Sequence, residues 1–190
     1  MMKREECLQI LAKHRKDEIV VNGWVFEWPT ISGHDLDIGG VGAMGHHAGF
    51  ALGLALAQPD RRVVCLIGDG AILMDLGALV TIGSVAPQNL TMMVMENGTY
   101  EITGGQPIPG AGKVNLATMA KGAGWSHSYE FKDLGAFEEN VEKLLKEPGP
   151  IFADLKVTAR DMSFPVKPFP RPTATEIKEN FRAALSKIVE

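Results

Sequence analysis

The sequence has 190 residues, of which 45% are hydrophobic and 22% charged, and a formal net charge of −4. This globular composition excludes a disordered or fibrous chain, and no basic stripe interleaved with aromatic residues occurs, so a nucleic-acid partner is not expected. The longest apolar stretch, residues 48–57, is too short to cross a bilayer, and the charged amino terminus lacks a signal-peptide pattern. We therefore expect a cytoplasmic protein with no membrane partner.

Strand-like and helix-like segments alternate along the first third of the chain. Apolar positions among charges predict a surface helix near residues 2–14, and residues 18–22 predict a short strand. Residues 24–44 are rich in glycine, proline and aromatic side chains without a clear period, which predicts a loop. The small apolar residues 45–57 predict a helix packed on a sheet, and the apolar run 62–67 predicts a parallel strand buried on both faces.

The same alternation continues to the carboxyl end. The predicted elements are a helix at 71–83, a strand at 90–95, a glycine-rich loop at 97–112, a helix at 116–122, a strand at 125–129, a helix at 134–146 and a strand at 151–157. Strands separated by helices indicate an α/β fold, a three-layer parallel sheet flanked by helices on both faces. We expect one domain over residues 1–190, with 164–190 a proline-rich linker and a carboxyl-terminal helix capped by Thr173 or Thr175.

A glycine-rich turn, Gly68-Asp69-Gly70-Ala71, directly follows the strand predicted at 62–67. Glycines permit a tight turn, and a helix that begins there offers free N–H groups to an anion. Asp69 beside a phosphate requires a cation between them, and Mg²⁺ fits because it takes hard oxygen ligands shared with phosphates. By itself this turn is explained as well by a plain strand-to-helix connection.

A second motif, Asn97-Gly98-Thr99, follows the strand predicted at 90–95, with 26 residues (71–96) between it and Gly70. That spacer holds one helix and one strand, so Asp69 and Asn97 should end adjacent parallel strands. A carboxylate oxygen, an amide oxygen and the Thr99 carbonyl could then face one metal ion. Asn-Gly alone is more often a plain turn, and the pairing at this distance is what makes the magnesium interpretation specific.

This pair of motifs resembles the signature of thiamine diphosphate enzymes. Within that family, four segments resemble the C-terminal half of phosphonopyruvate decarboxylases and the separate beta subunit of sulfopyruvate decarboxylases. The segments are Gly42-Ala43-Met44-Gly45-His46, Gly68-Asp69-Gly70, Leu76-Gly77-Ala78-Leu79 and Glu101 to Pro107. The resemblance covers roughly residues 2–160 and implies the thiamine diphosphate-binding fold, as its diphosphate domain.

The resemblance implies a role for each matching residue at the cofactor. The Mg²⁺ ion would be held by the Asp69 and Asn97 side chains and by the Thr99 carbonyl. The diphosphate would lie on the turn of Gly68, with the N–H groups of Gly70 and Ala71 donating to it.

Two further residues would contact the cofactor rings. The Gly42 carbonyl would accept a hydrogen bond from the 4′-amino group, and Met44 would wedge between the two rings. The wedge brings that amino group close to the thiazolium C2, where a proton must leave. Ordinary core filling is the alternative for Met44.

His46 and Glu101 are the candidate catalytic residues. His46 and His47 lie at the start of a helix beside the proposed site, where an imidazole could contact substrate or transfer protons, although a polar turn residue is the simpler explanation. The resemblance favours His46, because it implies a histidine at that position. Glu101 lies in a loop that could close over the site, and loop scaffolding is an equal alternative. The aromatic segment 24–28 is expected to pack against a partner chain.

Two departures from the family pattern matter. Glu96 stands where the signature has a first asparagine and brings a negative charge close to the metal position. The glutamate that activates the aminopyrimidine ring belongs to a pyrimidine-binding domain, which this chain has no room for. A partner subunit, the alpha chain, must then supply it, and the resemblance implies a hetero-oligomer of at least two α and two β chains.

The expected function is that of a thiamine diphosphate- and Mg²⁺-dependent carboxy-lyase subunit acting on a small 2-oxo acid, sulfopyruvate or phosphonopyruvate first. The segment 24–28 lacks the Ser-Arg-Glu of those decarboxylases, which leaves the substrate open. An acetolactate synthase-like carboligase subunit and a catalytically inactive regulatory subunit are the alternatives. A nucleotide-binding domain is disfavoured because Gly39-Gly40-Val41-Gly42 does not have the GxGxxG spacing.

Overall fold

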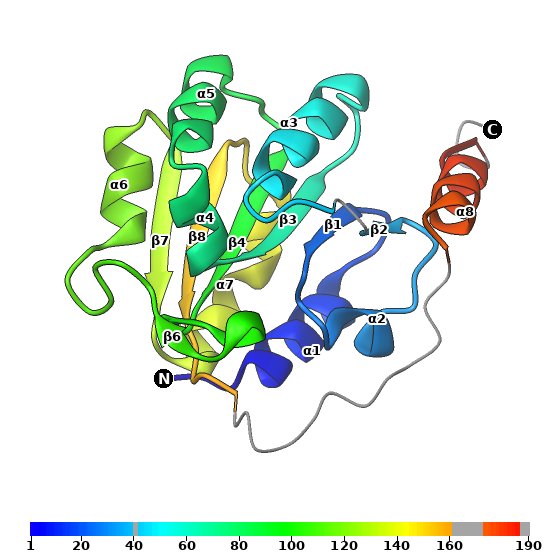
Figure 1. The fold of residues 1–190 in the computed structure, drawn as a ribbon. Helices are drawn as coiled ribbons and strands as arrows, with labels where there is room; N and C mark the ends of the chain where they lie inside the picture. The colour runs from blue at the N-terminus through cyan, green and yellow to red at the C-terminus, as the bar shows by residue number, and fades with distance from the viewer. Residues whose placement is uncertain (40–41, 161–172, 187–190) are drawn as a thin grey trace.

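Six parallel strands form the centre of the computed structural model, which describes residues 1–39, 42–160 and 173–186 (Figure 1). Their order across the sheet is β2-β1-β3-β4-β8-β7, and every neighbouring pair is parallel. The strands are β1 (Ile19–Gly23), β2 (Asp37–Ile38), β3 (Val63–Gly68), β4 (Leu90–Glu96), β7 (His127–Phe131) and β8 (Ile151–Lys156). A separate antiparallel pair joins β5 (Thr99–Tyr100) to β6 (Gln106–Pro107).

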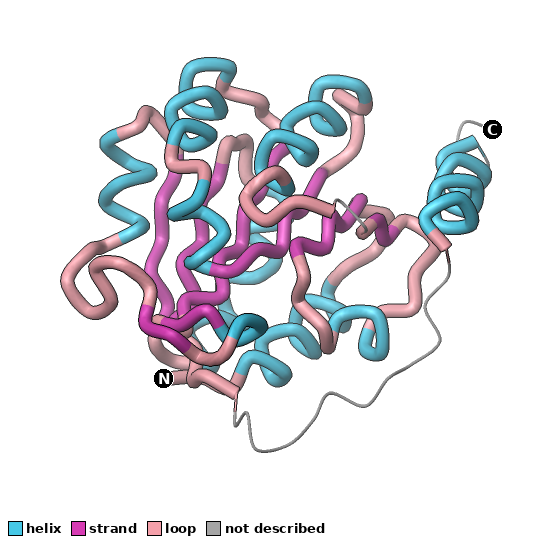
Figure 2. The backbone as a smooth tube through the Cα atoms, viewed as in Figure 1, coloured by secondary structure: helices cyan, strands magenta, loops and turns pink. Residues whose placement is uncertain are grey.

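Helices cover both faces of the sheet (Figure 2). One face packs against α1 (Arg4–His14), α2 (Trp28–Ile31) and α7 (Leu134–Lys146). The other packs against α3 (His47–Ala57), α4 (Asp69–Met74), α5 (Gly77–Val85), α6 (Leu116–Gly122) and α8 (Ala174–Ser186). A 3₁₀ turn, η1 (Glu101–Thr103), follows β5. The predicted three-layer α/β fold is confirmed.

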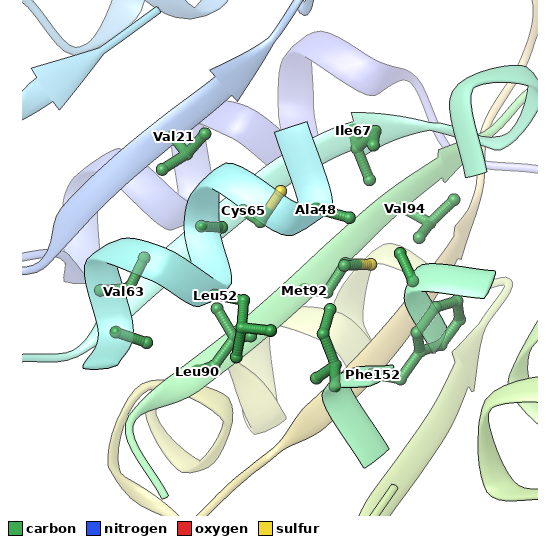
Figure 3. Close-up of a cluster of buried hydrophobic side chains, with 14 of the residues drawn as sticks. Val21, Ala48, Leu52, Val63, Cys65, Ile67, Leu90, Met92, Val94 and Phe152 are labelled. Carbon is green, nitrogen blue, oxygen red and sulfur yellow. The ribbon is translucent and has the colours of Figure 1, made fainter. Parts of the chain in front are cut away.

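The central strands are buried on both sides, as their unbroken apolar sequence predicts. In β3, Val63, Cys65 and Ile67 belong to the cluster beneath α3, whereas Val64 and Leu66 belong to the cluster beneath α1 and α7. Figure 3 shows the first cluster, with Ala48 and Leu52 of α3 lying over β3 and β4. The period of two in the side-chain direction thus builds two separate cores from one sheet.

The prediction of a loop over residues 24–44 is wrong in part, because this segment contains α2 and β2. Strand β2 pairs with β1 through Val20–Asp37 and Val21–Ile38. The Arg15 guanidinium donates to Ser32 and Asp37 and so holds the segment against the edge of the sheet. These contacts are tertiary and leave no periodic signal in the sequence.

The predicted helix at 71–83 is two helices, α4 and α5, with the break at Asp75 and Leu76. The loop before α3 packs into this break, where a Cβ on Gly45 would lie 3.3 Å from the Ala71 carbonyl oxygen and from Met74 Cβ. The loop thus lies against the carboxyl end of α4, where the chain turns into α5.

The strand predicted at 125–129 begins two residues later, at His127. Trp125 is buried instead between α5 and the sheet, where its Nε1–H donates to the Leu79 carbonyl at 3.0 Å. Its ring meets Phe152 edge-on, with 5.4 Å between the ring centroids. The hydrogen-bonded indole is thus used for packing and not for the strand ladder.

The last helix, α8, begins at Ala174 and is capped by Thr173, one of the two predicted caps, whose Oγ1 accepts a hydrogen bond from the Glu176 N–H at 3.2 Å. The Glu176 carboxylate accepts the Thr173 N–H at 2.7 Å, which completes a capping box. Phe181 and Ala184 of α8 are buried. Most of the predicted proline-rich linker lies outside the described residues. None of the helices in the described part of the chain is long and apolar enough to cross a membrane.

Candidate functional site

A pocket opens at the carboxyl ends of β1, β3 and β4. The strand order reverses between β1 and β3, and in open parallel sheets ligands bind at such a switch point. The pocket is lined by residues from the loops that follow these strands and from α1 and α3: Arg4, Gly23, Trp24, Val25, Phe26, Met44, His47, Gly68, Asp69, Gly70, Ala71, Met95, Asn97, Thr99, Tyr100, Glu101, Ile102 and Thr103.

Asp69 lies at the floor of this pocket and is 1% exposed. Its Oδ1 accepts the Gly70 N–H at 2.7 Å, and its Oδ2 accepts the Gly98 N–H at 2.7 Å. Burial raises the pKa of the Asp69 carboxyl from 3.8 to about 6, against the lowering effect of these two hydrogen bonds, and the nearby Glu96 charge raises it further. The hydrogen bonds described for the Asp69 carboxylate come from backbone N–H groups and not from a cationic side chain. In its charged form this buried group therefore lacks a bonded cation among the described residues.

Asn97 lies beside Asp69, as the two strand ends predict. Strands β3 and β4 are paired in the register Gly68–Met95, so the residues after each strand leave the same edge of the sheet. The Asn97 Oδ1 accepts the Thr99 N–H at 2.8 Å. The prediction that Asp69 and Asn97 follow adjacent parallel strands is confirmed.

Glu96 is paired with Lys156, whose Nζ lies 2.6 Å from Glu96 Oε2. Lys156 Nζ also lies 2.8 Å from the fully buried Asp154 and 3.3 Å from Glu130. Burial lowers the pKa of Lys156, but these acidic groups, led by Asp154 and by Glu96, which accepts a hydrogen bond from its ammonium, raise it overall. The lysine thus offsets part of the negative charge that Glu96 brings to this edge.

Residues in and next to the loop before α3 differ in whether they line the pocket. Met44 lines the pocket, whereas His46 is exposed, with its Nδ1 3.4 Å from the Met44 carbonyl, and is not part of the lining. Gly42 is also exposed and outside the lining. The next histidine, His47, is 1% exposed and does line the pocket.

Glu101 lines the pocket, but its carboxylate is held by two donors. Arg4 Nη1 donates to Oε2 at 2.8 Å, and the Arg160 N–H donates to Oε1 at 2.7 Å. Arg4 also binds Glu27, with 2.6 Å between Nη2 and Oε1. Glu101 thereby links η1 to α1 and to the segment after β8.

The aromatic segment 24–28 divides between pocket and core. Trp24 and Phe26 line the pocket. Trp28 is fully buried, and the Arg15 guanidinium lies 5.8 Å from its ring centroid. The expectation that this whole segment packs against a partner is therefore wrong for Trp28, because the chain's own core encloses it.

Sequence reasoning did not find Arg4, Trp24 or Tyr100 as pocket residues, and of the two adjacent histidines it favoured His46 over His47. Arg4 reaches the pocket from a helix 97 positions before Glu101, which no local pattern records. Which of the two adjacent histidines faces inward depends on the residue at which the helix begins. Helix α3 begins at His47, two residues later than the predicted start.

Residues 23–155 match the family described as thiamine pyrophosphate enzyme, C-terminal TPP binding domain. The chain belongs to this family.

Two relatives and one solved structure illustrate the match. The beta subunit of sulfopyruvate decarboxylase from Methanothermobacter thermautotrophicus is 34% identical over 169 residues, which cover 87% of this chain and 88% of that one. Phosphonopyruvate decarboxylase from Streptomyces viridochromogenes is 35% identical over 81% of this chain and 38% of its own. The structure of benzoylformate decarboxylase from Polynucleobacter necessarius superposes with a TM-score of 0.66 at 20% identity, over 82% of this chain and 33% of that one. The last likeness shows the fold.

Proposed function

We propose that this chain is the cofactor-binding subunit of a thiamine diphosphate- and Mg²⁺-dependent decarboxylase of small 2-oxo acids. The observation that carries the proposal is the pairing of buried Asp69 with Asn97 at the ends of adjacent strands, inside the pocket. The similarity over most of its length to a sulfopyruvate decarboxylase beta subunit supports the same class of reaction.

The donor set suits magnesium. Among the described residues, no three His, Cys, Asp or Glu side chains are grouped to hold a metal ion. The ligands would instead be one carboxylate from Asp69, the amide oxygen of Asn97 and the Thr99 carbonyl, with diphosphate oxygens completing the shell. Such a mixed set of hard oxygen ligands is typical of Mg²⁺ shared with a phosphate.

The organic cofactor would lie along the same wall. Gly68, Gly70 and Ala71 would hold the diphosphate, with Met44 wedged between the two rings and the Gly42 carbonyl at the 4′-amino group. When bound, thiamine diphosphate supplies the carbanion that attacks the keto carbon and the electron sink that carries the charge after carbon dioxide leaves. His46 and Glu101 remain the candidates for contact with the substrate.

A partner subunit would complete the site. Glu101, the glutamate in the pocket wall, is held by Arg4 and by the Arg160 N–H, and would not activate the aminopyrimidine ring. That role falls to a glutamate of a pyrimidine-binding subunit in an α2β2 or larger assembly. Exposed apolar side chains on α4, α5 and the turn between them, Met74 and Val80 at 61% each and Leu76 at 37%, support such an interface.

The substrate class depends on the same partner. Sulfonate and phosphonate groups require a cation, and an arginine fork binds them best. Arg4, which lines the pocket, is bound by Glu27 and Glu101. The cation for sulfopyruvate or phosphonopyruvate would therefore come from the partner chain.

The direct test is turnover by the reconstituted complex. The chain is purified alone and co-expressed with a pyrimidine-binding subunit, and carbon dioxide and aldehyde release are measured with sulfopyruvate, phosphonopyruvate and pyruvate. We expect release only with partner, thiamine diphosphate and Mg²⁺ together. A hydroxy-oxo acid product would indicate the carboligase, and cofactor binding without turnover of any 2-oxo acid would leave the regulatory subunit.

The Asp69 carboxyl should titrate with a midpoint near pH 6 in the metal-free protein, because burial raises its pKa to about 6. Bound Mg²⁺ favours the charged form, so saturation with Mg²⁺ and cofactor should lower the midpoint. Metal binding then competes with the proton, and the affinity for Mg²⁺ should fall as the pH drops below 6. Carbon-13 NMR of labelled aspartate follows the midpoint directly, and Asp69→Asn assigns the resonance. A metal-free midpoint near 4 would contradict the prediction.

A further inference from the structure

His47 is a buried histidine at the wall of the pocket, and the metal and diphosphate ligands proposed above do not include it. It is the first residue of α3 and is 1% exposed. A Cβ placed on Gly23 would lie 3.2 Å from His47 Cγ and 2.6 Å from the Leu66 carbonyl oxygen. The imidazole therefore lies between the ends of β1 and β3, where the strand order reverses.

Neither ring nitrogen of His47 has a hydrogen-bond partner among the residues that the structure describes. Buried polar atoms are nearly always paired, because an unmade hydrogen bond is costly once water is excluded. Burial lowers the pKa of His47, and the neighbouring His46 lowers it further. At neutral pH the ring is thus a neutral imidazole with one N–H donor and one acceptor nitrogen.

Trp24 holds the imidazole in this place. Its backbone has φ 65°, a left-handed conformation that a bulky side chain rarely adopts. The ring centroids of Trp24 and His47 are 6.0 Å apart, and the two planes meet at 72°. Strained backbone of this kind is concentrated at ligand sites, where the surrounding structure enforces it.

The imidazole shares its pocket with the glycine turn. Gly23, His47, Gly68, Asp69 and Gly70 all line one pocket. A Cβ placed on Gly68 would meet nothing within 4 Å, so the end of β3 faces open space. An anion on that turn would present oxygen atoms, which accept hydrogen bonds, to a donor that now has no acceptor.

We propose that His47 is a further cofactor-binding residue, whose N–H donates a hydrogen bond to a phosphoryl oxygen of the diphosphate. This inference rests on the proposed function, since it requires thiamine diphosphate in this pocket. The bond would be made by a neutral donor to a charged acceptor, the stronger kind of protein hydrogen bond.

The test measures affinity and not turnover. Calorimetry on the complex with the partner subunit, at saturating Mg²⁺, gives the Kd of thiamine diphosphate and, separately, of inorganic pyrophosphate. His47→Phe should weaken both ligands roughly 10- to 100-fold, the range for a hydrogen bond to a charged group. His47→Gln, which keeps an N–H donor, should recover most of the loss. The matched control is His127→Phe, on the half-exposed histidine that begins β7 at the opposite edge of the sheet.

Each other outcome overturns a defined part of the argument. If His47→Phe binds both ligands within twofold of the wild type, the His47 contact is absent while the proposed function stands. If thiamine diphosphate weakens and pyrophosphate does not, His47 acts on the rings and the diphosphate contact is refuted. If the wild-type complex binds no thiamine diphosphate, both proposals fail. Thermal unfolding checks each variant, and His47→Met, with its adaptable apolar side chain, takes the place of a misfolded His47→Phe.

Discussion

Replacing Asp69 by asparagine should weaken Mg²⁺-dependent binding of thiamine diphosphate by about 100-fold or more. Outer-sphere partners of protein metal sites are typically worth 10- to 100-fold in metal affinity, and Asp69 would be a direct ligand that carries the charge of the site. Calorimetry of the complex with its partner, with and without Mg²⁺, measures the loss. In the metal-free titration the variant and the wild type should be alike, because the defect acts through the cation.

The control for Asp69→Asn is Asp60→Asn, which removes the same charge from an exposed position. Asp60 precedes β3 at the amino edge of the sheet, so its loss should leave the affinity within about twofold, as screened surface charges usually do. Equal losses in the two variants would mean that net charge and not coordination sets the affinity. Undiminished binding by Asp69→Asn would refute the magnesium site itself.

Replacing Arg4 by alanine should lower the free energy of unfolding by about 2–3 kcal/mol. Removal of one partner from a buried ion pair costs about 3–5 kcal/mol because it leaves charge without a counter-ion. The figure is reduced here because the Glu27 side chain is 25% exposed and can take up water, whereas that of Glu101 is 11% exposed. Urea denaturation of the chain, read as a shift of the midpoint at constant m-value, gives the change.

Lys13→Ala is the matched comparison for Arg4→Ala. Lys13 also lies on α1 and pairs with Glu138 at 2.9 Å, but the two side chains are 68% and 45% exposed. An exposed pair contributes at most about 1 kcal/mol, so the midpoint should hardly move. Similar shifts in both variants would show that the Arg4 cluster is no more buried in solution than a surface pair.

The order of the main elements followed from the sequence because burial on both faces leaves a strong local signal. The unbroken apolar run of β3 and the apolar stripe of α7 needed no tertiary information. The errors lie where a distant contact decides the local structure. Trp125 carries a strand-forming side chain, yet its hydrogen bond to Leu79 removes it from β7. The short strand β2 exists through its pairing with β1 and the Arg15 contacts with Asp37, which no window of sequence contains.

The site divides in the same way. Asp69 and Asn97 could be placed from sequence because each directly follows a strand and the two strands are neighbours, so the ladder fixes their positions. Arg4 and Trp24 could not, because one reaches Glu101 across the fold and the other adopts a backbone conformation typical of glycine. The choice between His46 and His47 depended on a helix start, which sequence patterns locate only to within a few residues.

The pocket is lined by residues at the ends of strands and by residues on loops and turns, and these two groups lie on different parts of the scaffold. Asp69 and Asn97 stand within a residue of β3 and β4, whose ladder bonds fix their backbones. Trp24 and Phe26 lie on the loop after β1 and Ile102 lies on the short 3₁₀ turn η1, outside the helices and strands of the scaffold, where substitutions and insertions are tolerated. Divergence in the loop and turn residues can therefore change which molecule is accepted while the proposed cofactor ligands, Asp69 and Asn97, stay unaltered. Among homologues, variation in the loop and turn residues should accompany changes of substrate. Variation at the two strand ends should accompany loss of the enzymatic activity.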